Sequence, residues 1–315
     1  MNAPTVFSEI RDNPSLRPHW RDVLSFLTYL RTTANLKLRV HGECSQEDRP
    51  GIEDTTLNFP YIHRWKDQYR RGVLAKFYKL EAWHEANPTP ITMLTLTTYQ
   101  EGQYSRSMTG KNTTIPESFC LLKNSWVSLR HAIKYHLPDT SWCWIMEPHK
   151  TGYPHLHTVL FSEVNESAQT SIRDLWARKY KAGSYKHGVD FAVNTPGQTV
   201  QSIRNYLMKY VAKSFTTTGS QFSHGSVWSA GELVFNALVK KHGWRLFGAS
   251  RDLCKVMAYT KQTDDDIKWY ATEILNDDEG VNRLVWQLEE PTGWGNHTRP
   301  YRLLKRAVIS NEKNF

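Results

Sequence analysis

Hydrophobic and polar positions in the middle of the chain follow two periods, one typical of strands and one of helices. The threonine alternation of residues 91–98 (ITMLTLTT) predicts a strand. Residues 141–147 and 155–162 predict two more strands, and the glycine and two prolines between them predict a hairpin turn centred near residue 151. Residues 188–193 (GVDFAV) predict a short fourth strand.

Apolar residues three or four positions apart predict helices around these strands. The expected helices cover residues 17–33, 64–86, 116–136, 165–180, 200–215, 230–242 and 266–275. Polar segments with glycine and proline are expected to be irregular, and they cover residues 1–16, 41–60, 99–114 and 216–229.

The order of elements within residues 91–215 predicts the fold class. Strand, helix, hairpin, helix, strand and helix follow one another, which implies an α+β fold with a central antiparallel β-sheet and flanking helices. The string Asn87-Pro88-Thr89-Pro90 ends a helix and marks a boundary. We therefore predict a mostly helical N-terminal extension (1–89), a core (90–215) and a C-terminal extension that packs on the core (216–315).

The composition favours a nucleic-acid partner and a cytoplasmic location. The 315 residues carry a net charge of +9, from 40 Lys and Arg against 31 Asp and Glu, which favours a polyanion. The 12 Trp, 15 Tyr and 12 Phe suit base stacking. The four cysteines lack Cys-x-x-Cys spacing, so neither a zinc ribbon nor a disulfide framework is expected. Neither a signal peptide nor a run of 18 apolar residues occurs, so no membrane association is expected.

Two histidines and a glutamate form a candidate metal site. His155 and His157 are two residues apart on a predicted strand, so their side chains share one face. A hairpin centred near Thr151 places Glu147 opposite His155. Two imidazoles and a carboxylate can bind a metal while leaving positions open for substrate oxygens. The same residues are also compatible with a structural pair of histidines and a solvated glutamate.

A predicted helix near residue 210 carries candidate nucleophiles. Tyr206 and Tyr210 are four residues apart, and each precedes a lysine by three residues, Lys209 and Lys213. Residues four apart lie on one helical face, and a nearby cation favours the phenolate that attacks phosphorus. A tyrosine nucleophile gives a phosphotyrosine ester, which stores the bond and permits rejoining. An amphipathic helix whose tyrosines only pack has the same pattern.

These features together resemble the HUH endonucleases, in particular the rolling-circle replication initiators of plasmids and small viruses. The threonine-rich strand 91–98, the His155-Leu156-His157 triplet and a later Tyr-x-x-Lys helix follow the family's motif order. Glu147 has the place of the glutamate that often completes the metal site. The doubled tyrosine resembles the two-tyrosine class, and the pattern as a whole looks most like initiators of archaeal plasmids and viruses.

The resemblance implies a function and its chemistry. Glu147, His155 and His157 would hold a divalent ion, Mn or Mg. Tyr206 or Tyr210 would nick single-stranded DNA at a replication origin, leaving a 5′-phosphotyrosine and a free 3′ hydroxyl, and the second tyrosine would act later to release a circle. Lys209 and Lys213 would orient or neutralise the phosphate, or remain solvated charges.

Other segments predict partners. Basic residues in 173–187 and 242–251 are candidates for DNA contacts: Arg173, Arg178, Lys179, Lys181, Arg245 and Arg251. No G-x-x-x-x-G-K-[ST] string occurs, so strand separation would need a host helicase, and synthesis a host polymerase. The sequence does not predict the oligomeric state.

Three alternatives stay open. A two-tyrosine HUH transposase shares the same chemistry. A metal-containing nucleic-acid-binding protein would bind without cleaving, and a metal-dependent hydrolase would cleave without a covalent adduct. A conjugative relaxase fits less well, because relaxases usually place the tyrosine before the histidine motif.

Overall fold

A computed structural model describes residues 3–44, 55–98, 113–193, 228–258, 267–275 and 282–283. The chain forms two compact units. The first consists of Met1–Leu27 with Arg64–Met257, and the second of Thr28–His63 with Ala258–Phe315. The predicted division at residues 89 and 215 stays a prediction.

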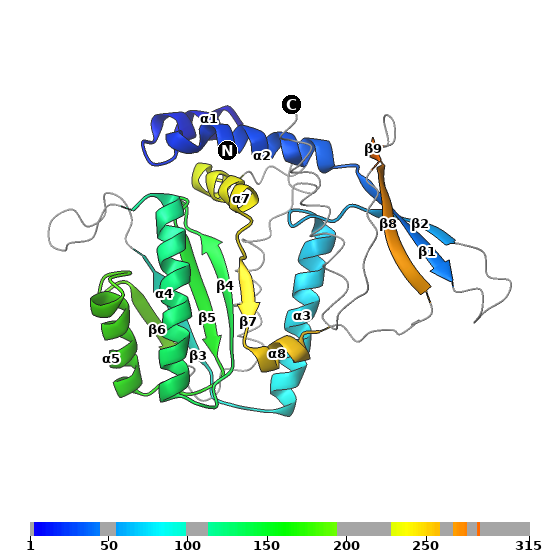
Figure 1. Cartoon of the computed structure of the whole chain (residues 1–315). Helices are drawn as coiled ribbons and strands as arrows, with labels where there is room; N and C mark the ends of the chain where they lie inside the picture. The colour runs from blue at the N-terminus through cyan, green and yellow to red at the C-terminus, as the bar shows by residue number, and fades with distance from the viewer. Residues whose placement is uncertain are drawn as a thin grey trace. The chain divides into compact units, whose positions relative to one another are not determined.

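The first unit contains a five-stranded antiparallel sheet, ordered β6-β3-β5-β4-β7 (Figure 1). Its strands are β3 (Thr92–Thr97), β4 (Trp142–Pro148), β5 (Pro154–Leu160), β6 (Val189–Val193) and β7 (Phe247–Ala249). With its flanking helices, this sheet confirms the predicted α+β class. The short strand β7 was not predicted.

The described helices agree with most of the predicted ones. They are α1 (Ala3–Asp12), α2 (Trp20–Thr33), α3 (Asp67–Ala86), α4 (Ile115–His136), α5 (Glu166–Asp174), α7 (Ala230–His242) and α8 (Arg251–Val256). A 3-10 turn, Arg17–His19, precedes α2, and a π-helical turn, Leu175–Lys179, follows α5. The expectation that residues 1–16 are irregular is wrong, because Val6 and Ile10, four apart, are buried on α1.

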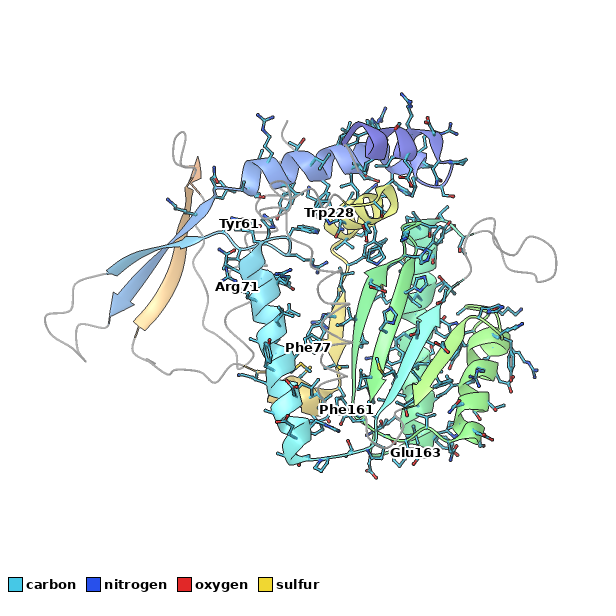
Figure 2. The ribbon with its side chains drawn as sticks, turned by 180° about the vertical axis from the view of Figure 1, so that it is seen from behind. Tyr61, Arg71, Phe77, Phe161, Glu163 and Trp228 are labelled. Atoms are coloured by element: carbon cyan, nitrogen blue, oxygen red, sulfur yellow. The ribbon has the colours of Figure 1, made fainter. Side chains whose placement is uncertain are left out.

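Helices α4 and α5 cover one face of the sheet (Figures 1 and 2). Leu94, Leu96 and Leu156 on β3 and β5 are buried on this face. The side-chain hydroxyls of Thr98, after β3, and Ser118 on α4 are hydrogen-bonded, which fixes α4 to this side. The residues that alternate with these leucines therefore lie on the opposite face.

Local caps fix where two of the helices begin. Thr114 and Glu117 form a reciprocal capping box at the start of α4, and Ser229 and Glu232 form one at the start of α7. Each box satisfies backbone N–H groups that have no partner within the helix. Helix α7 ends at Gly243, whose φ of 63° lies in the left-handed region that suits glycine.

The second unit corrects two predictions. Its sheet, ordered β2-β1-β8-β9, contains β1 (Lys37–Cys44), β2 (Thr55–Pro60), β8 (Ile267–Leu275) and β9 (Asn282–Arg283). The predicted loop 41–60 thus includes parts of two strands, and the predicted helix 266–275 is a strand paired with β1. Strands β1 and β8 lie more than 200 residues apart in the chain, so local spacing gave no signal of their pairing.

Some predictions fall outside the described residues. These are the helix 200–215, almost all of the linker 216–229 and most of the loop 99–114. Among the described residues, no helix is both long and apolar enough to cross a membrane.

Candidate metal and nucleic-acid site

The β4–β5 hairpin brings the three predicted metal ligands onto one face. Its ladder pairs Glu147 with His155 and Ile145 with His157, so the predicted register is confirmed. The turn between the strands contains Gly152, whose φ of 86° an L side chain rarely adopts. This face is the one opposite α4, because Leu156, between the two histidines, points into the core under that helix.

Two threonines on β3 hold the histidine rings. Thr95 is paired with His157 and Thr97 with His155. The Oγ1 atom of Thr95 lies 3.1 Å from His157 Nδ1, and that of Thr97 lies 3.4 Å from His155 Nδ1. Engaging Nδ1 in this way leaves the Nε2 atom of each ring as the candidate metal-binding nitrogen.

The glutamate and the second histidine are bonded to each other. His157 Nε2 lies 2.9 Å from Glu147 Oε1, and the two residues are only 5% and 8% exposed. In the described part of the chain, no three or more His, Cys, Asp and Glu side chains are arranged to hold a metal ion as they stand. A metal ion at this face would have to replace the Glu147–His157 hydrogen bond.

The donor set nevertheless fits a divalent ion. Two imidazoles and one carboxylate occupy one sheet face, and hydroxyl groups orient both rings from behind. His149, in the hairpin turn, stacks on His155 with ring centroids 5.1 Å apart and planes at 17°. The turn thus limits how the His155 ring can rotate.

Sequence reasoning missed the supporting residues. It identified residues 91–98 as a strand but assigned no role to Thr95 or Thr97. The signal was available, because threonines two apart on a strand share a face, as the histidines do. Their partnership with the histidines, however, depends on the β3–β5 register, which local sequence does not fix.

The predicted DNA contacts divide between the two sides of the sheet. Arg173 lies over the ring of Phe191, 5.0 Å from its centroid, and Phe191 is paired with Leu94. Arg173 therefore lies on the side of α5, away from the histidines. Arg178, in the following π-helical turn, forms an ion pair with Asp174 at 3.2 Å.

The remaining predicted residues are exposed or undescribed. Lys179 and Lys181 are exposed after α5, Arg251 begins α8, and Arg245 precedes β7. The candidate catalytic residues Tyr206, Lys209, Tyr210 and Lys213 lie outside the described residues.

A comparison with protein families identifies the segment that carries this site. Residues 91–215 match a family model described as a replication-associated protein of the ORF2 type. The match covers less than half of the chain, and it includes β3 to β6 and both candidate tyrosines. It supports a Rep-like protein of the rolling-circle type. No curated protein and no solved structure matches the chain.

Proposed function

We propose that this protein initiates rolling-circle replication by nicking single-stranded origin DNA, as a two-tyrosine HUH endonuclease. The observation that carries the proposal lies within the segment that matches replication-associated proteins. There, Glu147, His155 and His157 converge on one sheet face, with both histidine rings held from β3.

The proposed reaction is a transesterification by tyrosine. The phenolate oxygen of Tyr206 or Tyr210 attacks the scissile phosphorus. The bond between phosphorus and the 3′ oxygen breaks, and this oxygen takes up a proton to become the 3′ hydroxyl. The 5′ side of the break stays on the tyrosine as a phosphodiester, so a later 3′ hydroxyl can reverse the step.

The residues of the histidine face would prepare the phosphate for attack. Glu147, His155 and His157 would hold a divalent ion, Mn or Mg, which when bound polarises a phosphoryl oxygen. Thr95 and Thr97 would keep the Nε2 atoms of the histidines directed towards the ion. The hydrogen-bonded pair of Glu147 and His157 would separate to accept it. Lys209 and Lys213 would neutralise charge on the phosphate from the tyrosine helix.

The test is a covalent-adduct assay. Single-stranded oligonucleotides from the candidate origin of the protein's replicon, each labelled at the 3′ end, are incubated with Mn²⁺ or Mg²⁺ and then with EDTA. The products are separated on a denaturing protein gel. We expect a labelled adduct that needs the metal, persists in at least one of Tyr206→Phe and Tyr210→Phe, and disappears in the double variant.

Other outcomes would support the alternative functions. Cleavage without an adduct would indicate a hydrolase that uses water. Binding without cleavage of any strand would indicate a nucleic-acid-binding protein. Substantial adduct formation by the double Phe variant would reject both tyrosines as nucleophiles.

A further inference from the structure

Arg245 lies next to the candidate metal site on the neighbouring strand. The β4–β7 ladder pairs Ile145 with Phe247, and the backbone N–H of Met146 donates to the carbonyl of Leu246 at 2.8 Å. Continuing this register by one pair places Arg245 beside Glu147. Residues opposite each other on antiparallel strands have Cβ atoms about 4.5–5.5 Å apart.

The neighbours of Arg245 show to which side it points. Trp244 stacks on Phe119 of α4, with ring centroids 3.7 Å apart, and Leu246 is 1% exposed. Both therefore lie on the α4 side of the sheet. Because side chains alternate along an extended segment, Arg245 lies on the histidine side, where it is exposed.

Helix α3 brings a second cation to the same place. The ring of Phe77 on α3 lies 5.4 Å from the ring of Phe247, which is two residues after Arg245 (Figure 2). Lys76 precedes Phe77 and is half-buried. Burial lowers the pKa of Lys76, Cys254 raises it, and the charge of Arg245 lowers it further.

Two cations are thus held together without a carboxylate to compensate Arg245. Among the described residues, the Arg245 guanidinium has no carboxylate oxygen within salt-bridge distance. Like charges in proximity repel each other, and an anion placed between them relieves that repulsion. An arginine also presents a planar fork of donors that matches phosphate oxygens.

We propose that Arg245 and Lys76 bind one backbone phosphate of the DNA strand, next to the phosphate held at Glu147, His155 and His157. The choice of single-stranded DNA as ligand rests on the proposed function. The pair would fix the register of the strand, so that a single phosphodiester reaches the metal site. Arg245 and Lys76 are positioning residues in this scheme, because they contact the substrate beside the bond that breaks.

Binding without cleavage tests the proposal first. Fluorescence anisotropy with labelled single-stranded origin DNA in EDTA would be measured for the unmodified protein, Arg245→Gln, Lys76→Gln and the double variant. Each single substitution should weaken binding about tenfold or more. The double variant should lose less than the product of the two losses, because both residues contact one phosphate.

The matched control removes the same charge from the other side of the sheet. Lys134→Gln lies on the exposed side of α4 and should change the affinity by less than about twofold. Arg245→Lys should recover part of the affinity, because a lysine restores the charge but not the fork. Melting temperatures of all variants should match, since Arg245 is exposed.

A phosphate scan then identifies the contact. Neutral methylphosphonates would replace the phosphates of the oligonucleotide one at a time. At one position, or two neighbouring ones, the unmodified protein should lose affinity and Arg245→Gln should lose no more. The proposal fails if Arg245→Gln behaves like Lys134→Gln, if its loss persists at every position, or if the unmodified protein does not bind. Because EDTA excludes nicking, an Arg245-dependent contact in a protein that forms no adduct would reject the nicking function alone.

Discussion

The chemistry of the candidate site depends on hydroxyl groups as much as on its imidazoles. Neutral histidine carries one ring proton, and the partner of Nδ1 decides which nitrogen is left to bind a metal. Thr95 and Thr97 provide that partner for His157 and His155. The strand β3 therefore sets the chemistry of β5, although it supplies no metal ligand itself.

Removing these hydroxyls should weaken metal binding. We expect Thr95→Val and Thr97→Val each to raise the Mn²⁺ concentration for half-maximal adduct formation about ten- to a hundredfold. Valine keeps the shape of threonine but leaves Nδ1 without its partner. Thr158→Val removes a buried hydroxyl from the face opposite the histidines and serves as control. An unchanged Mn²⁺ requirement in both β3 variants would show that the threonines do not orient the ligands.

The cysteines should differ in reactivity. Burial raises the pKa of Cys143 to about 12, and its side chain is 0% exposed. At pH 8 the thiolate fraction is then about one in ten thousand, whereas Cys120 and Cys254 are exposed. We expect iodoacetamide to modify Cys120 and Cys254 in the native protein, and Cys143 after unfolding. Peptide mapping by mass spectrometry measures this, and rapid native labelling of Cys143 would contradict its burial in β4.

Among the secondary-structure elements, those with local signals could be predicted. The hairpin β4–β5 was predicted with its register, because a Gly- and Pro-containing turn separates two short apolar strands. The strand β8 was predicted as a helix, because its apolar residues have helical spacing, while its partner β1 lies far away in the chain. Tertiary pairing overrides local preference there.

The candidate site was predictable to the same extent. Glu147, His155 and His157 share a short hairpin, so local sequence sufficed to bring them together. Arg245 was predicted as a DNA contact, but its place beside Glu147 depends on β7, which contributes three residues at the sheet edge. Lys76 had no signal in the sequence, because α3 reaches that edge through packing of Phe77 on Phe247.

Helix α7 supports the hairpin through a close backbone contact. A Cβ atom on Gly231, in its first turn, would lie 2.3 Å from both Gly152 N and Lys150 O, in the turn between β4 and β5. We expect Gly231→Ala to lower the free energy of unfolding by about 1–3 kcal/mol, because backbone must move to admit the methyl group. Urea denaturation measures this, with the exposed Ser128→Ala on α4 as control. A stability equal to that of the control would show that the turn yields freely.

At the scale of the first unit, the two faces of the sheet carry different cations. Arg245 lies beside the candidate metal ligands, while Arg173 and Arg178 lie on the α5 side, each over an aromatic ring. A net charge of +9 attracts DNA to any surface of the protein. Proximity to the bond that breaks is what should separate the roles of these residues.

The α5-side arginines should therefore affect binding and spare the chemical step. An interaction equal in the ground state and the transition state changes KM and leaves kcat unaltered. We expect Arg173→Gln combined with Arg178→Gln to raise the KM for origin DNA about three- to tenfold, with kcat for adduct formation unchanged. It should also make binding less sensitive to salt, because fewer phosphates are neutralised. Rates at saturating DNA, measured across several salt concentrations, separate the two constants. A fall in kcat would mean that the α5 side reaches the scissile phosphate, which its place across the sheet from His155 and His157 argues against.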